Sequence, residues 1–218
     1  MSIKLKGSTA GSVALDAPAN TSPSGSDISF TLPIADGSSG QVLTTNGSGA
    51  LSFANEGKIL QVQQTHLTTT SSQSLSVNTL AEVSGLSVSI TPKSSTSNML
   101  VFIRWNGEFG STTNYNMIFG IRRDSTDIGN PSASGNRPIG HAMPAQNYYT
   151  ADANSTPDSC YFSFLDTTRS SGTSQITYKA TVKSAAASTL YNQRTAGNSD
   201  GEDFELPTSN IVVMEVAA

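Results

Sequence analysis

Two histidines and one cysteine are the side chains of this sequence best suited to metal or nucleophilic chemistry. His66 and His141 lie in different segments, without the spacing that brings two zinc ligands together on one element. Cys160 and His141 could form a nucleophile and its base, but no third group is indicated that would orient the histidine. Cys160 also opens an apolar stretch, where a buried and unreactive thiol is expected. The sequence therefore predicts no metal site, no cofactor and no catalytic cysteine.

Carboxylates could supply an acid and base pair for sugar hydrolysis. The candidates all stand among turn-forming residues, where a solvated role is expected: Asp124, Asp127, Asp152, Asp158, Asp200, Glu202 and Asp203. The run from Asp200 to Asp203 could hold a cation, but it lacks the alternating oxygen ligands and the closing Glu of a calcium loop. We therefore expect a protein that is not an enzyme.

Tyrosines beside amide side chains are the best candidates for recognition of a ligand. Asn147, Tyr148 and Tyr149 stand together in a long loop, and Tyr191 is expected to begin another loop. An exposed tyrosine ring can stack on a sugar or anchor a protein contact. We predict these four as a surface-recognition set, with a host-surface glycan as the candidate ligand. The alternative is that these tyrosines lie in an interface between subunits.

The composition favours strands and turns over helices. Hydrophobic residues make up 36% and charged residues 13% of the 218 residues, and Ser, Thr, Gly and Asn fill much of the remainder. The net charge of -4 and the scattered Lys and Arg residues give no basic stripe for nucleic acid. No apolar run approaches the roughly 18 residues of a membrane span, and the N-terminus lacks the apolar core of a signal peptide. We expect synthesis in a cytoplasm, no nucleic-acid partner and no membrane insertion.

Residues 1–57 differ from the rest of the chain. Short apolar pieces, such as the alternating run Ile28-Ser29-Phe30-Thr31-Leu32, are separated by clusters of Gly, Ser, Pro and Asn. Each piece is too short to form a core, so these strands are expected to bury their apolar side chains against copies of themselves. The alternative is a flexible linker, which rarely alternates in this way. We predict that 1–57 serves attachment and trimerisation.

From residue 58 the strand patterns lengthen. Leu86–Ile90 alternates apolar residues with serine, as a half-buried strand does. Met99–Trp105 has a continuous apolar opening, which indicates a central strand covered on both faces at one end. Arg122–Asp127 predicts a hairpin tip, and 129–158 a long loop. About seven or eight strands without a convincing helix predict an all-β fold, with an antiparallel, jelly-roll-like β-sandwich over 58–218.

Two parts of the chain resemble phage structural proteins. The stretches Gly7–Asn20 and 29–53, the latter ending in Gly40-Gln-Val-Leu-Thr-Thr-Asn-Gly-Ser-Gly-Ala-Leu-Ser-Phe53, resemble a segment of tail-fibre and other virion structural proteins of marine phages, notably cyanophages. Later stretches are similar to the globular domain that often follows that segment: Leu60–Thr65, Val83–Pro92, Ser163–Asp166 and Val213–Ala218. The resemblance leaves the loop at 125–158 uncovered.

The resemblance implies a component of the virion, commonly a homotrimer, with no cofactor and no reaction. It favours a tail fibre in which 1–57 contacts other virion proteins, while the β-sandwich displays its loops for host adhesion. A capsid decoration or head-fibre protein is the alternative, because such modules are shared among these proteins. A glycan-degrading tailspike is disfavoured because the chain is short and offers no placed carboxylate pair. The expected location is the virion, assembled in the host cytoplasm.

Overall fold

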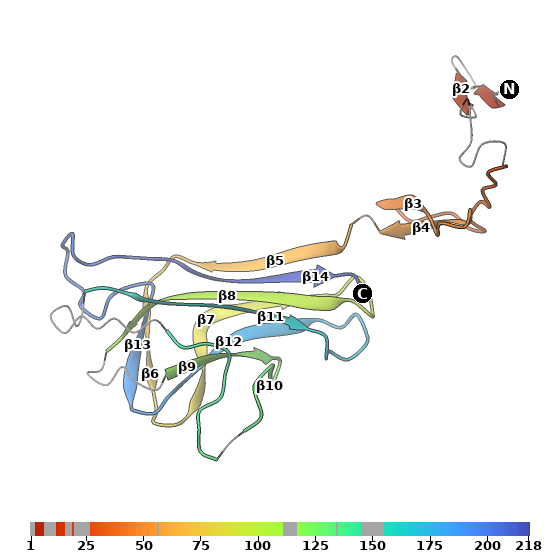
Figure 1. Ribbon diagram of the computed structural model, residues 1–218. Coiled ribbons are helices and arrows are strands. Elements are labelled where there is room, and N and C mark those ends of the chain that lie inside the picture. The colour runs from red at the N-terminus through yellow and green to blue at the C-terminus, as the bar shows by residue number, and fades with distance from the viewer. Residues whose placement is uncertain are drawn as a thin grey trace. The chain divides into compact units, whose positions relative to one another are not determined.

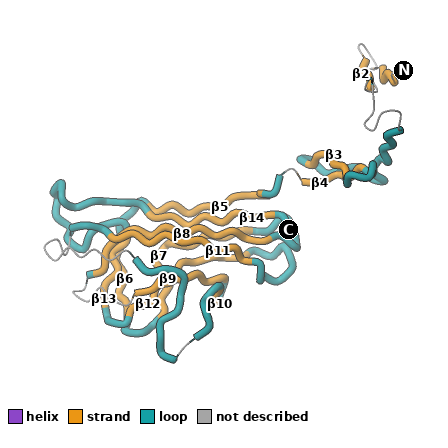
Figure 2. The backbone as a smooth tube through the Cα atoms, viewed as in Figure 1, coloured by secondary structure: helices purple, strands orange, loops and turns teal. Residues whose placement is uncertain are grey.

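The computed structural model describes residues 3–6, 12–15, 19, 27–55, 57–110, 117–133, 135–144 and 155–218. The chain divides into an N-terminal unit, Met1–Glu56, and a C-terminal unit, Gly57–Ala218, and each is considered by itself (Figure 1). The described residues form antiparallel strands, turns and loops and contain no helix (Figure 2), so none that could cross a membrane. The prediction of an all-β, antiparallel protein is confirmed.

The N-terminal unit contains two short antiparallel pairs: β1 (Ile3–Lys6) with β2 (Ser12–Leu15), and β3 (Gln41–Thr45) with β4 (Leu51–Asn55). The turn between β3 and β4 is closed by Asn46, whose side-chain oxygen accepts hydrogen bonds from the amides of Ser48 and Ala50 at 2.8 and 3.2 Å. The amide of Thr31 donates to the carbonyl of Gly49 in this turn at 2.9 Å. The described strands of this unit are therefore held by backbone pairing within two short hairpins.

Two antiparallel sheets form the C-terminal unit. The larger contains β5 (Ile59–Leu67), β14 (Ser209–Val216), β8 (Asn98–Phe109), β11 (Asp158–Asp166), β13 (Ser188–Asn192) and β6 (Ser71–Leu75). The smaller has the order β10 (Thr126–Ile128), β9 (Met117–Arg123), β12 (Ile176–Ser184) and β7 (Leu80–Ile90). β8 pairs with β14 along 98–104, with β11 along 99–107 and with β13 along 107–109. The larger sheet is thus organised around β8.

The two sheets share one apolar core. Trp105 of β8 is fully buried, and its ring centroid lies 5.0 Å from that of Phe119 in β9, on the opposite sheet. The indole nitrogen of Trp105 donates a 2.8 Å hydrogen bond to the side-chain oxygen of Asn192 in β13, which satisfies the one polar group of the ring. Two antiparallel sheets over a common core are consistent with the predicted β-sandwich.

A buried carboxylate ties the two sheets together. Asp166, the last residue of β11, accepts hydrogen bonds from the Tyr178 hydroxyl and from Arg123 Nη1, both at 2.7 Å and both from the smaller sheet. The amide and hydroxyl of Thr168 bind the same carboxylate at 3.0 Å. Burial alone would raise the pKa of Asp166, but these hydrogen bonds outweigh it and hold the pKa below its ordinary value. A charge is therefore stabilised where the sheets meet.

A second carboxylate fixes the loop between β7 and β8. Glu215 of β14 accepts hydrogen bonds from the amides of Lys93 and Ser94 at 2.9 Å and from the Ser97 hydroxyl at 2.6 Å. Burial acts to raise the pKa of Glu215, and the hydrogen bonds, led by that from the Lys93 amide, lower it overall. The loop that Pro92 begins is thus held against the larger sheet.

The strand predictions hold best where the apolar pattern is strong. The hairpin tip at Arg122–Asp127 is confirmed, because β9 and β10 flank a turn at Asp124, which has a φ of 51°. The sequence did not predict β6 or β13, which pair with each other. Both strands are short and rich in Ser and Thr, so pairing with a neighbour rather than an apolar pattern determines their conformation.

Replacing Asp166 with alanine should leave the Arg123 guanidinium and the Tyr178 hydroxyl without their shared acceptor. Because an unpaired buried charge is costly, we expect the free energy of unfolding at pH 7, measured by urea denaturation, to fall by about 3–5 kcal/mol. Asp127→Ala is the control, since it removes a partly exposed ion pair with Arg122 and should cost less than about 1 kcal/mol. Equal losses in the two variants would contradict the assigned role of Asp166.

The stabilisation by Asp166 should also depend on pH. Because its folded-state pKa is lowered, the contribution is fully present above the unfolded value near 4 and is lost as the pH falls through the folded pKa. The difference in unfolding free energy between wild type and Asp166→Ala should therefore shrink below about pH 4. A difference that is constant with pH would show that the carboxylate charge is not what stabilises the fold.

Candidate functional site

Three of the four predicted recognition residues, Asn147, Tyr148 and Tyr149, lie outside the described residues. Tyr191 lies within β13, opposite Ser72 of β6 on one side and Glu108 of β8 on the other. The expectation that Tyr191 begins a loop is therefore wrong. It belongs to a strand that is paired on both sides, and the loop begins only after it.

The Tyr191 ring is already in contact with its own chain. The Arg194 guanidinium carbon lies 4.3 Å from the ring centroid, as in a cation–π contact. The ring edge also approaches Gly110 so closely that a Cβ there would lie 2.5 Å from Tyr191 Cε2. The half-buried ring thus has at most one face free for stacking. Gly110 is one position where a close approach excludes a side chain.

Cys160 and His141 both pack against other side chains of the C-terminal unit. The Cys160 thiol, 2% exposed, lies on the inward face of β11. Burial and then the charge of Asp158 raise the pKa of the thiol to about 12, whereas a nucleophilic thiolate needs a lowered pKa. The His141 Nε2 lies 2.8 Å from the Ile128 carbonyl oxygen, a contact that requires its proton on Nε2, and the ring packs 5.6 Å from that of Phe162. Cys160 thus lies in the core, and the half-buried His141 ring packs against Phe162.

The carboxylates that could serve sugar hydrolysis lie at separate places in the fold. Asp158 is the first residue of β11 and is 8% exposed, so the expectation that it is solvated in a turn is wrong. Asp124 and Asp127 are hydrogen-bonded to Thr177 and Arg122 beside the β9–β10 turn. Asp152 lies outside the described residues, and three more are exposed in one turn: Asp200, Glu202 and Asp203. Within the described parts of the chain, no group of three or more His, Cys, Asp or Glu side chains could hold a metal ion.

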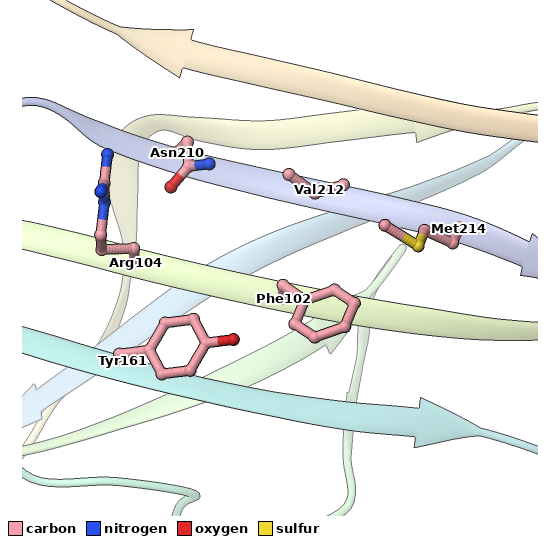
Figure 3. Close-up of a pocket in the computed structure, with 6 residues that line it drawn as sticks. All are labelled: Phe102, Arg104, Tyr161, Asn210, Val212 and Met214. Atoms are coloured by element: carbon pink, nitrogen blue, oxygen red, sulfur yellow. The ribbon is translucent and has the colours of Figure 1, made fainter.

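An open pocket of about 270 Å³ lies on the outer face of the larger sheet (Figure 3). It is lined by two residues of β8, one of β11 and three of β14: Phe102, Arg104, Tyr161, Asn210, Val212 and Met214. These side chains meet because alternation along β8 turns Val101, Ile103 and Trp105 inward and the residues between them outward. Cross-strand register then places Tyr161 and Asn210 on either side of Arg104.

The pocket is suited to binding rather than to acid–base chemistry. Its six lining residues include no carboxylate, histidine or thiol. One end is apolar, with Phe102, Val212 and Met214, and the other is polar, with Arg104 and Asn210 beside the exposed Tyr161 ring. The sequence analysis did not select these residues, because they come from three strands that are far apart in the sequence. The sequence pattern that pointed to this face was the apolar character of Met99–Trp105 on both faces of its strand.

A second open groove is lined by residues between Arg123 and Ile176. It contains two arginines whose guanidinium groups already donate hydrogen bonds to the protein. Arg169 Nη1 donates to the carbonyls of Ser170 and Gly172 at 3.2 and 2.9 Å, and Nη2 donates to the Ser94 carbonyl at 2.7 Å. The Arg169 Nε donates to the Ser97 carbonyl. The Arg123 guanidinium binds Asp166, so both arginines fix the segments around this groove through their hydrogen bonds.

Comparisons with known proteins add no assignment to this geometry. A search against protein-family models found no match, and a search of the curated proteins found no similar sequence.

The buried thiol gives a direct test of the C-terminal unit. At pH 8, a thiol pKa of about 12 leaves about three orders of magnitude less thiolate than an ordinary cysteine has. We therefore expect Cys160 to react with a maleimide only after unfolding in urea, as followed by mass spectrometry. Rapid labelling of the folded chain would show that the inward face of β11 is accessible.

Proposed function

We propose that this chain is a structural protein of a phage particle, a homotrimeric tail fibre. In this proposal the N-terminal unit attaches to other virion proteins and joins three chains, and the C-terminal unit serves adhesion to the host surface. The virion assignment follows from the resemblance of 7–20 and 29–53 to segments of marine-phage fibre proteins. The observation that carries the assembly role is the exposure of apolar side chains in the N-terminal unit.

Among the described residues of the N-terminal unit, six large apolar side chains are exposed. The least exposed of them retains 40% of its accessible surface: Ile28, Phe30, Leu32, Ile34, Leu43 and Phe53. The first four occupy every second position from residue 28 to residue 34. Leu43 lies opposite Phe53 in the β3–β4 pair. Covering half of one such side chain contributes about 1 kcal/mol, so covering all six contributes on the order of 5–10 kcal/mol per chain. A two-stranded hairpin alone is marginally stable in water. Sister copies of the same segment can supply that cover.

The strand pairing of the C-terminal unit supports a jelly-roll topology. The pairs are nested along the chain, with β5 beside β14, β6 beside β13, β7 beside β12, β8 beside β11 and β9 beside β10. The two outermost pairs lie in the larger sheet, and the three pairs inside them lie in the smaller, the larger and the smaller sheet in turn. A long antiparallel ribbon folded over into two sheets has this pattern, which occurs in capsid and lectin domains.

Trimerisation fits an adhesive role because linked copies multiply weak sites. Joining three C-terminal units converts the second and third binding events into intramolecular ones, with gains of about 10²–10⁴ in avidity. The surface-recognition set remains Asn147, Tyr148, Tyr149 and Tyr191. Of these, Tyr191 offers at most the ring face opposite Arg194.

The assembly role predicts that the apolar segment, and not the C-terminal unit alone, holds the chains together. Phe30→Ser combined with Leu32→Ser should reduce the mass of the particle in light scattering from that of three chains to that of one. The Asp166-dependent unfolding of the C-terminal unit should remain unchanged. Ser29→Ala, in the same segment, is the matched control and should stay trimeric. A wild-type chain that is monomeric at micromolar concentration would refute the proposal.

The adhesive role predicts binding to a host-surface glycan. On a glycan array, wild type should bind, and Tyr148→Ala combined with Tyr149→Ala should lose about 1–3 kcal/mol of affinity, as for loss of exposed aromatic anchors. Ser89→Ala, at an exposed position on the outer face of the smaller sheet, is the control. Binding that the double substitution leaves unchanged would remove these two tyrosines from the recognition site.

A further inference from the structure

The outer face of the larger sheet has an apolar end. In cross-strand register, Val62 of β5 lies beside Met214 of β14, Met214 beside Leu100 of β8, and Leu100 beside Leu165 of β11. We name these four residues the apolar row. The next row contains Gln64, Val212, Phe102 and Ser163, and the one beyond it His66, Asn210, Arg104 and Tyr161. The face therefore changes from apolar to polar along the strands.

The outer face of the smaller sheet is different. It has a network of ion pairs in which Glu82 binds Lys179 at 3.0 Å and Arg122 at 3.3 Å, and Arg122 also binds Asp127 at 2.8 Å. Such a surface is suited to water. In the apolar row, Val62 is 49% and Leu165 is 45% exposed. The two faces thus differ in what they are suited to contact.

The position of the apolar row along the chain favours a sister copy as the group that covers it. Ile59, exposed at the start of β5, comes three residues after Glu56, the last residue of the N-terminal unit. Three residues span at most about 10 Å. Chains joined through their N-terminal units therefore hold their β5 strands at high local concentration. The apolar row and the row beside it contain no charged residue, so identical faces can meet without repulsion between like charges.

The size of the face agrees with contact between tethered copies. Four strands about 4.8 Å apart and nine residues at about 3.4 Å each give a face of roughly 600 Å², and the apolar half is about 300 Å². A stable interface between free proteins buries about 800 Å² per partner. The face is therefore too small to hold free units together, but large enough to order units that are already linked.

We infer that the apolar row is where the C-terminal units of sister chains pack against one another. The inference rests on the proposed assembly through the N-terminal unit. It gives the larger sheet an inward position in the assembly, and leaves the ion-paired smaller sheet outward. In this arrangement a sister chain also covers Leu100 and Phe102, the outward apolar residues of β8.

Two matched cysteine reporters test this arrangement in the full chain. Ser163→Cys lies next to the apolar row on β11, and Ser89→Cys lies on the outer face of β7; both positions are exposed within one chain. The native Cys160 does not interfere because it is buried. In the trimer we expect a bulky maleimide to label Cys at 163 about 10-fold or more slowly than at 89, which corresponds to docking for at least about nine-tenths of the time.

Two further variants separate the inference from the proposed function. Val62→Lys should abolish the protection at 163 while light scattering still reports three chains. Phe30→Ser with Leu32→Ser should abolish both the protection and the trimer. Equal labelling at 163 and 89 in a chain of trimeric mass would overturn the inference alone and leave the face to a different protein. A wild type of monomeric mass would overturn the proposed function and, with it, the inference.

Discussion

A β-strand that is apolar on both faces has to be covered on both, and β8 has this property between Met99 and Ile103. Its inward side chains build the core with the smaller sheet, while Leu100 and Phe102 project to the other side. The three neighbours of β8 satisfy its backbone but add no layer over its outer face. The organisation of the larger sheet, the open pocket and the proposed contact between sister chains all follow from this one strand.

Buried polar groups determine how the ends of the C-terminal unit are closed. Asp166 joins a strand of the larger sheet to Tyr178 and Arg123 of the smaller one. Glu215 holds the loop that precedes β8. Both carboxylates are satisfied by several donors, so their low pKa values and the geometry of the loops have the same cause. An apolar core alone would not specify these loop positions.

The sequence predicts the parts of the fold that depend on local pattern. The antiparallel strands of the described residues and the tip at Arg122–Asp127 follow from alternation and turn residues that a single segment contains. β6 and β13 could not be predicted because these short segments show little apolar pattern and become strands by pairing with each other and, for β13, with β8. The pocket depends on register among β8, β11 and β14, which a single sequence does not contain. The sequence predicts a loop at Tyr191 because its five-residue strand is too short to show an alternation of apolar and polar residues.

The nested pairing of strands also affects how the protein is made. β14 lies between β5 and β8, although β5 is the first and β14 the last strand of the C-terminal unit to leave the ribosome. The β5–β14 and β14–β8 pairings therefore cannot form until synthesis of the unit is finished. These pairings join distant parts of the sequence, and such contacts form slowly. In the proposed assembly, the exposed N-terminal segments of neighbouring nascent chains can meet during this delay. The proposed pairing of sister chains would then precede completion of the two-sheet unit that each of them carries.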